Sequence, residues 1–233
     1  MFEYLLMPLD AHFDYGFGMT AEAYKDAADK LAEERRGMHG HLPIRFLLRH
    51  AIELYLKSGI LIFHRKLHLP YGIGGESEPM VRTDKGWKSL KTIHSIKLLH
   101  AYWDDLFKEH ADYLAANTRT DWSMPDNLPN LVNLIDGNDP GSTFYRYPTT
   151  SDPQKDKKKS SSQRVPLEKL LEKMASGKGT VKSMLLIDQN EEIVDSFQLN
   201  TDDDAKVGDA LVRVADFLSC AHAAMRNELA GGR

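Results

Sequence analysis

Charged and polar side chains recur at four-residue intervals in the N-terminal half of the chain. In an α-helix this spacing places them in a slowly drifting line, and His50 lies about 100° from Arg49 on the same side. One interpretation is a solvent-exposed face on which neighbouring ion pairs contribute about 0.2–0.5 kcal/mol each. The line, called the polar stripe below, consists of Arg45, Arg49, Glu53 and Lys57.

A second interpretation gives the polar stripe a functional role. Between positions 43 and 64 the other residues are nearly all apolar, which leaves little room for a solvated face. The stripe would then line a groove against a later helix, where His94 and Lys97 could meet it. At a helix start, His94 has the alternative role of packing or local hydrogen bonding.

Arg146 lies between two tyrosines in the segment DPGSTFYRYPTTSDP. A guanidinium beside Tyr145 and Tyr147 could hold a phosphate while a base stacks nearby, as in proteins that bind single-stranded nucleic acid. The Tyr-Pro step also favours an extended backbone, so Arg146 could instead bond carbonyl groups and pin the loop. The residue types alone favour neither interpretation.

Two histidine pairs have spacings that suit a metal ion, His39 with His41 and His64 with His68. Histidines four apart on a helix can share a zinc ion, but Pro70 ends the helix near His68 and no third ligand is suitably spaced. We therefore expect surface or loop histidines, with neither a metal site nor a cofactor.

Apolar residues at helical spacing, with capping and stop residues, predict that helices position these groups. The central helix, from Pro43 to His64, is apolar over most of its circumference and should be surrounded by other helices. The spacing in Thr92–Leu114 predicts a long partner for it. Further helices are expected over Thr20–Arg36, Leu128–Ile135, Pro166–Ala175 and Ala205–Leu229.

Three parts of the chain do not fit a helical pattern. Lys66–Gly86 is rich in glycine and proline and is expected to be a long loop. Positions 151–164 carry lysine and serine without large apolar residues, which predicts a flexible linker more than a nucleic-acid contact. Val181–Ile187 and Ile193–Leu199 are β-rich runs that flank a turn, so a β-hairpin is expected within 180–200.

The composition of the 233 residues fits a single domain with a full core, since 42% of them are apolar. One cysteine, Cys220, excludes an internal disulfide, and the first residues lack a signal-peptide pattern, so we expect a cytoplasmic protein. No apolar run reaches the roughly 20 residues that span a bilayer, and no membrane partner is expected. The net charge of −4 argues against wholesale nucleic-acid coating and leaves only a local basic surface for RNA or DNA.

Three strings, taken in order, resemble the helical core of the HEPN superfamily (higher eukaryotes and prokaryotes nucleotide-binding domains). They are FLLRHAIELYLKSGI, IHSIKLL and FYRYP. Members of that family are usually small helical bundles with a Glu-x3-Lys helix, a later helix that opens with His and leucines, and an Arg-Tyr-Pro before the final helix. The matching positions here are Glu53 and Lys57, His94 with Leu98 and Leu99, and Arg146, Tyr147 and Pro148.

The resemblance implies an all-α fold in one domain over 1–233. It would be a HEPN-like bundle with its core at 20–148, a closing helix at 202–229, and the β-hairpin as a small insertion before that helix. Many members are metal-independent ribonucleases of toxin–antitoxin and anti-phage systems, and they act as dimers.

The resemblance also implies a division of roles among the candidate residues. The family's catalytic motif is Arg-x4-6-His, and Arg45 with His50 fits that spacing. A histidine can move the proton of a ribose 2′-hydroxyl, while an arginine stabilises the extra charge on the phosphate. The binding residues implied are Arg49, Glu53, Lys57, His94, Arg146 and Tyr147.

Family members usually carry the catalytic pair on the closing helix, and this chain departs from that pattern. Arg213 and His222 are too far apart there, and His222 and Arg226 occur in the reverse order. The leading hypothesis is an RNA-directed endoribonuclease that forms a homodimer and has an antitoxin or another partner protein. The alternative is a catalytically silent module that binds a nucleotide or a partner protein. The spacing of Arg45 and His50 favours the first, and the missing motif favours the second.

Overall fold

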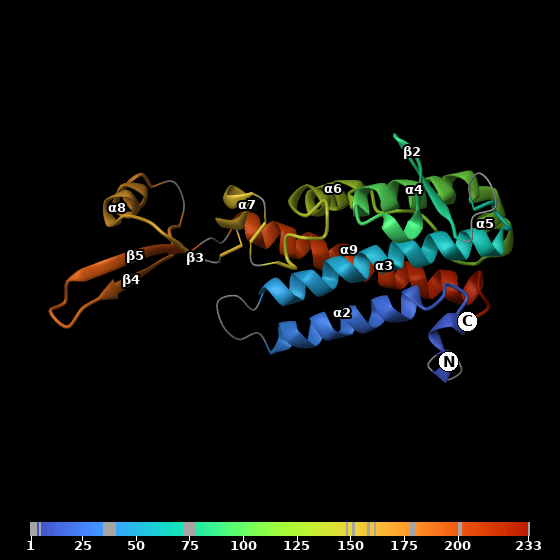
Figure 1. Ribbon diagram of the computed structural model, residues 1–233, viewed down its shortest axis with the longest axis horizontal. Helices are drawn as coiled ribbons and strands as arrows, with labels where there is room; N and C mark the ends of the chain where they lie inside the picture. Colours follow the sequence, from blue (N-terminus) through green and yellow to red (C-terminus); the bar gives the residue numbers. More distant parts are fainter. Residues whose placement is uncertain are drawn as a thin grey trace.

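A helical bundle and a smaller arm of strands and one helix make up the elongated molecule in Figure 1. The computed structural model describes residues 4, 6–34, 41–71, 78–147, 149–150, 152–157, 159–160, 162–177, 180–199 and 202–232. Both ends of the chain lie at the end of the bundle opposite to the arm. No helix within these ranges is long and apolar enough to cross a membrane.

The centre of the bundle is α3 (His41–Lys66), which extends slightly beyond the predicted helix Pro43–His64 at both ends. Almost every residue from Leu48 to His64 is buried, because α2 (Phe17–Glu33), α4 (Ile96–Glu109) and α9 (Asp202–Glu228) pack around it. The prediction that other helices surround this apolar helix is therefore confirmed. The helix is the core element that holds the polar stripe in place.

The helix predicted over Thr92–Leu114 is interrupted in the structure. It begins only at α4, where the Ser95 hydroxyl accepts a hydrogen bond from the Leu98 amide at 3.2 Å and caps the helix. His110 leaves helical geometry and separates α4 from α5 (Ala111–Asn117). His94 consequently lies in the segment before α4, after a short 3-10 turn at Leu90–Thr92.

The remaining bundle elements are α6 (Leu128–Asn138), which packs against α4 and α9, and a 3-10 turn at Leu9–Ala11. Pro129 lies in the first turn of α6, where its missing amide hydrogen costs nothing. The helix continues three residues beyond the predicted end at Ile135 and includes Gly137.

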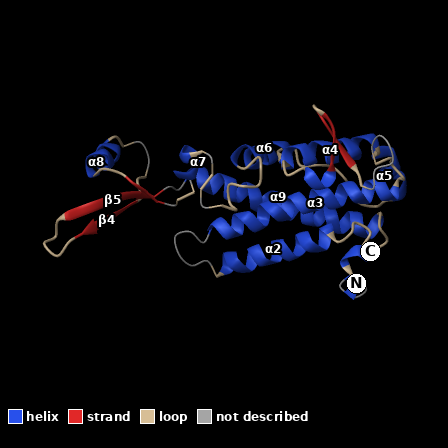
Figure 2. Cartoon of the chain, in the orientation of Figure 1, coloured by secondary structure: helices blue, strands red, loops and turns tan. Residues whose placement is uncertain are grey.

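The predicted all-α fold is wrong, because two small antiparallel sheets accompany the helices (Figure 2). The first sheet pairs β1 (Met80–Thr83), which lies inside the segment that was expected to be a loop, with β2 (Gly86–Ser89), which begins at the last residue of that segment. Each strand is only four residues long, too short for a clear alternation of apolar and polar residues. The packing of β1 against α4, with Val81 fully buried, stabilises a hairpin that local sequence does not reveal.

The second sheet has the order β3-β5-β4 and contains the expected hairpin. Its strands are β4 (Ser183–Ile187) and β5 (Ile193–Leu199). The third strand, β3 (Ser162–Arg164), and the short helix α7 (Pro153–Lys157) lie in the stretch that was expected to be a flexible linker. There the Lys159 ammonium is buried, donating to the Tyr147 carbonyl at 2.8 Å and pairing with Asp156 at 2.9 Å. Local composition cannot reveal a contact between a lysine and a loop twelve residues away, so the lysine and serine content indicated only a flexible linker.

The helix α8 (Leu167–Ala175) packs on β5 of the second sheet. We call the residues from 162 to 199 the arm. In Figures 1 and 2 the arm projects beyond the bundle, connected to α7 on one side and to α9 on the other. The polar stripe and the arm therefore belong to different parts of the molecule.

Candidate functional site

The polar stripe is buried, with its four residues between 1% and 8% exposed. It is therefore not a surface row of ion pairs. A buried charge is costly unless it is paired and hydrogen-bonded. The partners of the four side chains accordingly determine what the stripe can do.

Glu53 is the centre of the stripe's hydrogen bonds. Its Oε1 accepts from Lys57 Nζ at 2.9 Å and lies 3.0 Å from His94 Nδ1, while Oε2 accepts from Arg49 Nη1 at 3.1 Å. Burial alone would raise the pKa of this carboxyl, but Lys57, Arg49 and His94 together lower it. Glu53 is therefore an anion held between cations and an imidazole.

Arg49 ties this centre to the loop after α6. Its Nη2 donates to the His94 carbonyl and, at 3.4 Å, to the Asp139 carbonyl. The Asp139 carboxylate lies 3.5 Å from Arg49 Nε and also accepts from the amides of Thr143 and Phe144 at 2.8 and 3.0 Å. Arg49 and Glu53 thus hold together three segments of the chain, and their hydrogen bonds are used inside the protein. The predicted contact between His94 and the stripe exists, and 53% of the His94 side chain is exposed.

Arg45 lies at the other end of the stripe, against α9. Its Nη2 is 3.4 Å from the position that a Cβ at Gly208 would occupy. His50 follows five residues later, which turns it about 140° around the helix. The ring of His50 meets Tyr24 of α2 edge-on at 4.7 Å and stacks on Phe46 at 6.0 Å. Arg45 thus approaches α9, whereas His50 contacts α2.

A positively charged side chain, Arg146, lies near His50. The guanidinium of Arg146 lies 5.8 Å from the centre of the Phe46 ring, on which His50 stacks. Burial lowers the pKa of His50, Glu53 opposes this, and the positive charges of Arg146, Arg49 and Lys57 lower it further. The imidazole is therefore neutral at neutral pH, and its Nδ1 has no hydrogen-bond partner among the described residues.

Arg146 itself is exposed, as is the neighbouring Tyr147 with 52% of its surface accessible. The Tyr147 carbonyl accepts from Lys159, so the backbone of this segment is fixed while the two side chains face solvent. We call Phe46, His50, Arg146 and Tyr147 the aromatic–basic patch. Pro148, the last residue of the Arg-Tyr-Pro match, lies outside the described residues.

Two members of these sites were absent from the sequence-based candidates. Phe46 precedes His50 by four residues, a spacing that identifies helix neighbours and could have suggested it. Asp139 has no comparable signal, because it reaches Arg49 across 90 positions of the chain.

A second buried polar centre also escaped the sequence. Ser58 Oγ of α3 donates to Asp14 Oδ2, the Gly18 amide donates to the same oxygen at 2.7 Å, and His222 Nε2 of α9 lies 3.6 Å from it. Serine, histidine and aspartate can form a hydrolase triad, but there the serine bonds to the histidine. Here both Ser58 and His222 are directed at the carboxylate of Asp14, and all three are buried, so this centre joins helices.

The histidines weighed as metal ligands lie apart from one another or have other partners. His64 Nε2 is 2.8 Å from the Tyr102 hydroxyl, and His41 Nε2 is 3.2 Å from the Lys159 carbonyl. His39 lies outside the described residues. Within the described ranges, no three His, Cys, Asp or Glu residues gather in a way that could hold a metal ion.

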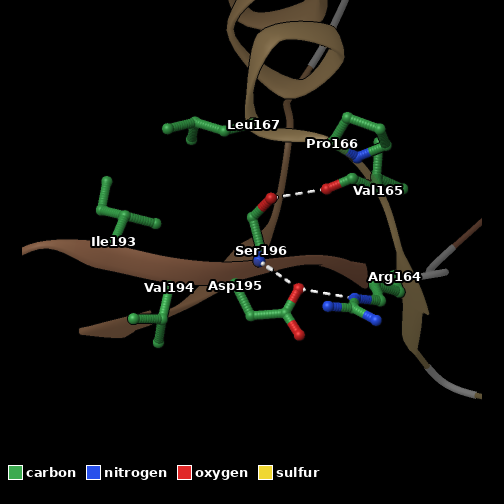
Figure 3. Close-up of a pocket in the computed structure, with 8 residues that line it drawn as sticks. All are labelled: Arg164, Val165, Pro166, Leu167, Ile193, Val194, Asp195 and Ser196. Carbon is green, nitrogen blue, oxygen red and sulfur yellow. Dashed lines mark hydrogen bonds and ion pairs between the residues drawn. The ribbon is translucent and has the colours of Figure 1, made fainter. Parts of the chain in front are cut away.

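A pocket of about 370 Å³ lies in the arm, where β3 and the start of α8 face β5 (Figure 3). The Arg164–Asp195 ion pair at 2.8 Å and the bond from Ser196 to the Val165 carbonyl cross it. None of the predicted site residues lines this pocket. The patch and the pocket are therefore separate features.

In comparisons with family models, with curated proteins and with solved structures, nothing matches this chain.

Proposed function

We propose that this chain is a HEPN-like, RNA-directed protein that binds single-stranded RNA at the aromatic–basic patch. The observation that carries the proposal is that His50 and Arg146, from distant parts of the sequence, both approach the ring of Phe46. Proteins that bind single strands combine cations for the backbone with rings on which bases stack. The patch supplies both, because the residue after Arg146 is Tyr147, whose side chain is exposed.

The buried hydrogen-bond network around Glu53 fixes the part of α3 that carries this site. Phe46, Arg49 and His50 belong to the same turns of α3, and Arg49 is held by Glu53, His94 and Asp139. A rigid helix presents the His50 ring more reproducibly than a loop would. Glu53, Lys57 and His94, the matching positions of the resemblance, therefore have a positioning role in this proposal.

A second candidate function is metal-independent cleavage of the bound RNA, and the neutral state of His50 favours it. A neutral imidazole can take the proton of a ribose 2′-hydroxyl as that oxygen attacks the adjacent phosphorus. The bond to the 5′ oxygen then breaks, that oxygen takes a proton from water, and a 2′,3′-cyclic phosphate remains. Because Arg45 packs towards α9, Arg146 is better placed than Arg45 to stabilise the phosphate charge beside His50.

The proposal includes a cytoplasmic location and a homodimer, with an antitoxin or other protein as a further partner. A single cysteine, which rules out an internal disulfide, agrees with a reducing compartment. The partner protein and the dimer come from the HEPN resemblance.

RNA binding can be tested by fluorescence anisotropy of a labelled single-stranded RNA with the purified full chain. We expect Arg146→Gln and Phe46→Leu each to weaken binding about tenfold, or about 1.4 kcal/mol. Arg213→Gln is the matched control, because Arg213 is a half-exposed arginine on α9 and its nearest partner is Asp209 at 3.6 Å. Equal affinity of the wild type and Arg146→Gln would rule out the patch as the binding site.

Cleavage is tested separately, with unlabelled RNA and EDTA. Products with 2′,3′-cyclic phosphate ends that disappear in His50→Ala support the nuclease. Intact RNA with normal binding supports the silent module, and unchanged cleavage by His50→Ala would reject His50 as the catalytic base.

A further inference from the structure

The free edge of the arm's sheet carries an uninterrupted apolar run. Met184, Leu185, Leu186 and Ile187 follow one another in β4, and each is between 37% and 58% exposed. Edge strands are normally protected by charge, proline or a bulge. Within Ser183–Ile187 there is no charge and no proline, and the register irregularity between Leu186 and Ile187 skips a residue of β5 and none of β4.

The backbone of β4 also has free bonding capacity towards this edge. The Lys182 carbonyl accepts from the Leu199 amide at 2.9 Å, so the even-numbered positions of β4 bond towards β5. Because bonding direction alternates along a strand, the N–H and C=O groups of Ser183, Leu185 and Ile187 point outward. The edge therefore offers both apolar side chains and an unused ladder of polar backbone groups.

We propose that β4 pairs with β4 of a second copy of this chain, antiparallel, about a two-fold axis at Leu185. In this register Leu185 faces Leu185 of the other copy, and Ser183 faces Ile187. Every outward-pointing residue then meets another outward-pointing residue, which is the condition for a complete antiparallel ladder. This inference does not depend on RNA binding at the aromatic–basic patch, and it supplies an interface for the proposed homodimer.

Charge complementarity argues for a second copy over an unrelated strand. Lys182 lies just before β4, and Asp188 lies just after it with Glu191 and Glu192 in the same turn. An antiparallel pair places the basic end of each strand against the acidic end of the other, so Lys182 opposes Asp188 at both ends. The amides of Asn190 and Glu192 donate to Asp188 Oδ1 at 2.8 and 2.9 Å and fix the position of that carboxylate.

The other edge of the sheet explains why the assembly would stop at two copies. β3 has only three residues, all polar, and Arg164 is engaged with Asp195. A β4–β4 contact uses the same surface on both copies, so it closes on itself and does not form fibres. Since the arm projects beyond the bundle, the β4 edge is open to such a partner (Figure 1).

The pairing would also gather apolar side chains on the face that α8 covers. Ile193 and Ser196 point to the side of α8 in Figure 3. Ile187 and Leu185 are their cross-strand partners, so they lie on the same face. The two-fold axis brings Leu185 and Ile187 of both copies together there.

The test is the mass of the full chain in solution, measured by sedimentation equilibrium over a range of concentrations. We expect a dimer whose dissociation constant rises at least tenfold in Leu185→Lys, which places two ammonium groups at the axis. Val194→Lys is the matched control, because Val194 is 60% exposed on the central strand β5 and is not at the edge. It should leave the dimer intact.

A charge variant keeps the test valid if Leu185→Lys disturbs the arm. Lys182 is exposed, and Lys182→Glu should also weaken the dimer because it places a second acidic group against Asp188 of the other copy. Lys173 is likewise exposed but lies on α8, so Lys173→Glu should not weaken the dimer. A wild type that is monomeric at its highest soluble concentration would overturn the proposal. So would equal dissociation by Val194→Lys and Leu185→Lys, or an edge that binds only a different protein.

Discussion

Glu53 shows how one buried residue can hold a site together without belonging to it. Its two carboxylate oxygens lie within hydrogen-bond distance of Arg49, Lys57 and His94, and the first two of these are almost completely buried. Moving such charges out of water costs several kcal/mol per ion unless they remain paired. The main role of the Glu53 carboxylate is therefore to compensate the buried positive charges of Arg49 and Lys57.

Replacing Glu53 by alanine should leave Arg49 and Lys57 buried with uncompensated charge. We expect the free energy of unfolding to fall by about 3–5 kcal/mol, which urea denaturation measures. Lys108→Ala is the control, because Lys108 forms an i,i+4 pair with Asp104 but is exposed, and its removal should barely change stability. Similar losses in both variants would contradict the role assigned to the buried network.

Asp14 gives the molecule a pH dependence of defined sign. Burial would raise the pKa of this carboxyl, but hydrogen bonds from His222, Ser58 and Gly18 lower it from 3.8 to about 2. A lowered pKa in the folded state stabilises the protein above the unfolded pKa, and that stability is lost as pH falls through the folded pKa. The lowered pKa of Asp14 therefore contributes about 2 kcal/mol to the free energy of unfolding at neutral pH.

The stability difference between the wild type and Asp14→Asn should therefore be constant above about pH 5 and shrink between pH 4 and pH 2. Chemical denaturation at several pH values measures this difference and cancels the other carboxylates. Asp209→Asn is a useful comparison, since Asp209 is exposed and its nearest cation, Arg213, lies 3.6 Å away. A difference that grows as the pH falls would mean that Asp14 is not the stabilised anion.

At the residue scale, spacing predicted local pairs and missed distant ones. Arg49, Glu53 and Lys57 are neighbours because they lie four apart on one helix. That they are buried depends on α4 and the loop after α6, which bring His94 and Asp139 to them. Spacing also paired Arg45 with His50, and in the fold Arg45 approaches α9 while His50 contacts α2.

At the scale of elements, long periodic helices were predictable and short strands were not. The signal for α3 extends over many turns, so its bounds differ from the prediction by only two residues at each end. In β1 and β2 the pattern is too short, and tertiary packing of Val81 supplies what the local sequence lacks. The break at His110 is likewise invisible in the apolar pattern of 92–114, which continues through it.

The junction of α2 and α9 depends on a glycine. A Cβ at Gly18 would lie 1.9 Å from His222 Nε2, so only glycine lets the two helices approach while His222 reaches Asp14. Gly18→Ala should lower stability by about 1–3 kcal/mol through overpacking. Thermal denaturation of the variant measures the loss.

Gly137→Ala is the matched control for this prediction. Gly137 is also helical, in α6, and nothing lies within 4 Å of a Cβ built there. Alanine at that position should stabilise the protein by about 0.5–1 kcal/mol, since it restricts the unfolded chain. The close approach of α2 and α9 would be refuted by equal effects of the two substitutions.

At the scale of the whole molecule, the structure separates a deeply buried helix from an arm whose elements pack mainly on one another. Opening of a protein is local where few buried apolar contacts hold it. In the arm, all residues of β4 are exposed, whereas α3 is buried along most of its length. The two regions should therefore differ strongly in the free energy of opening.

Amide hydrogen exchange tests this organisation and the proposed β4 pairing together. Amides in the middle of α3 should exchange most slowly, because only global unfolding exposes them. In β4, the amides of Met184 and Leu186 bond towards β5 and should show the same protection at all protein concentrations. The amides of Ser183, Leu185 and Ile187 face the open edge, so they should exchange rapidly in dilute protein and slowly once dimers form. In Leu185→Lys that dependence on concentration should vanish while protection of α3 stays unchanged, because the substitution acts at the edge and not on the core. If the odd-numbered amides were protected at every concentration, they would bond within one chain, and β4 would have no free edge to offer.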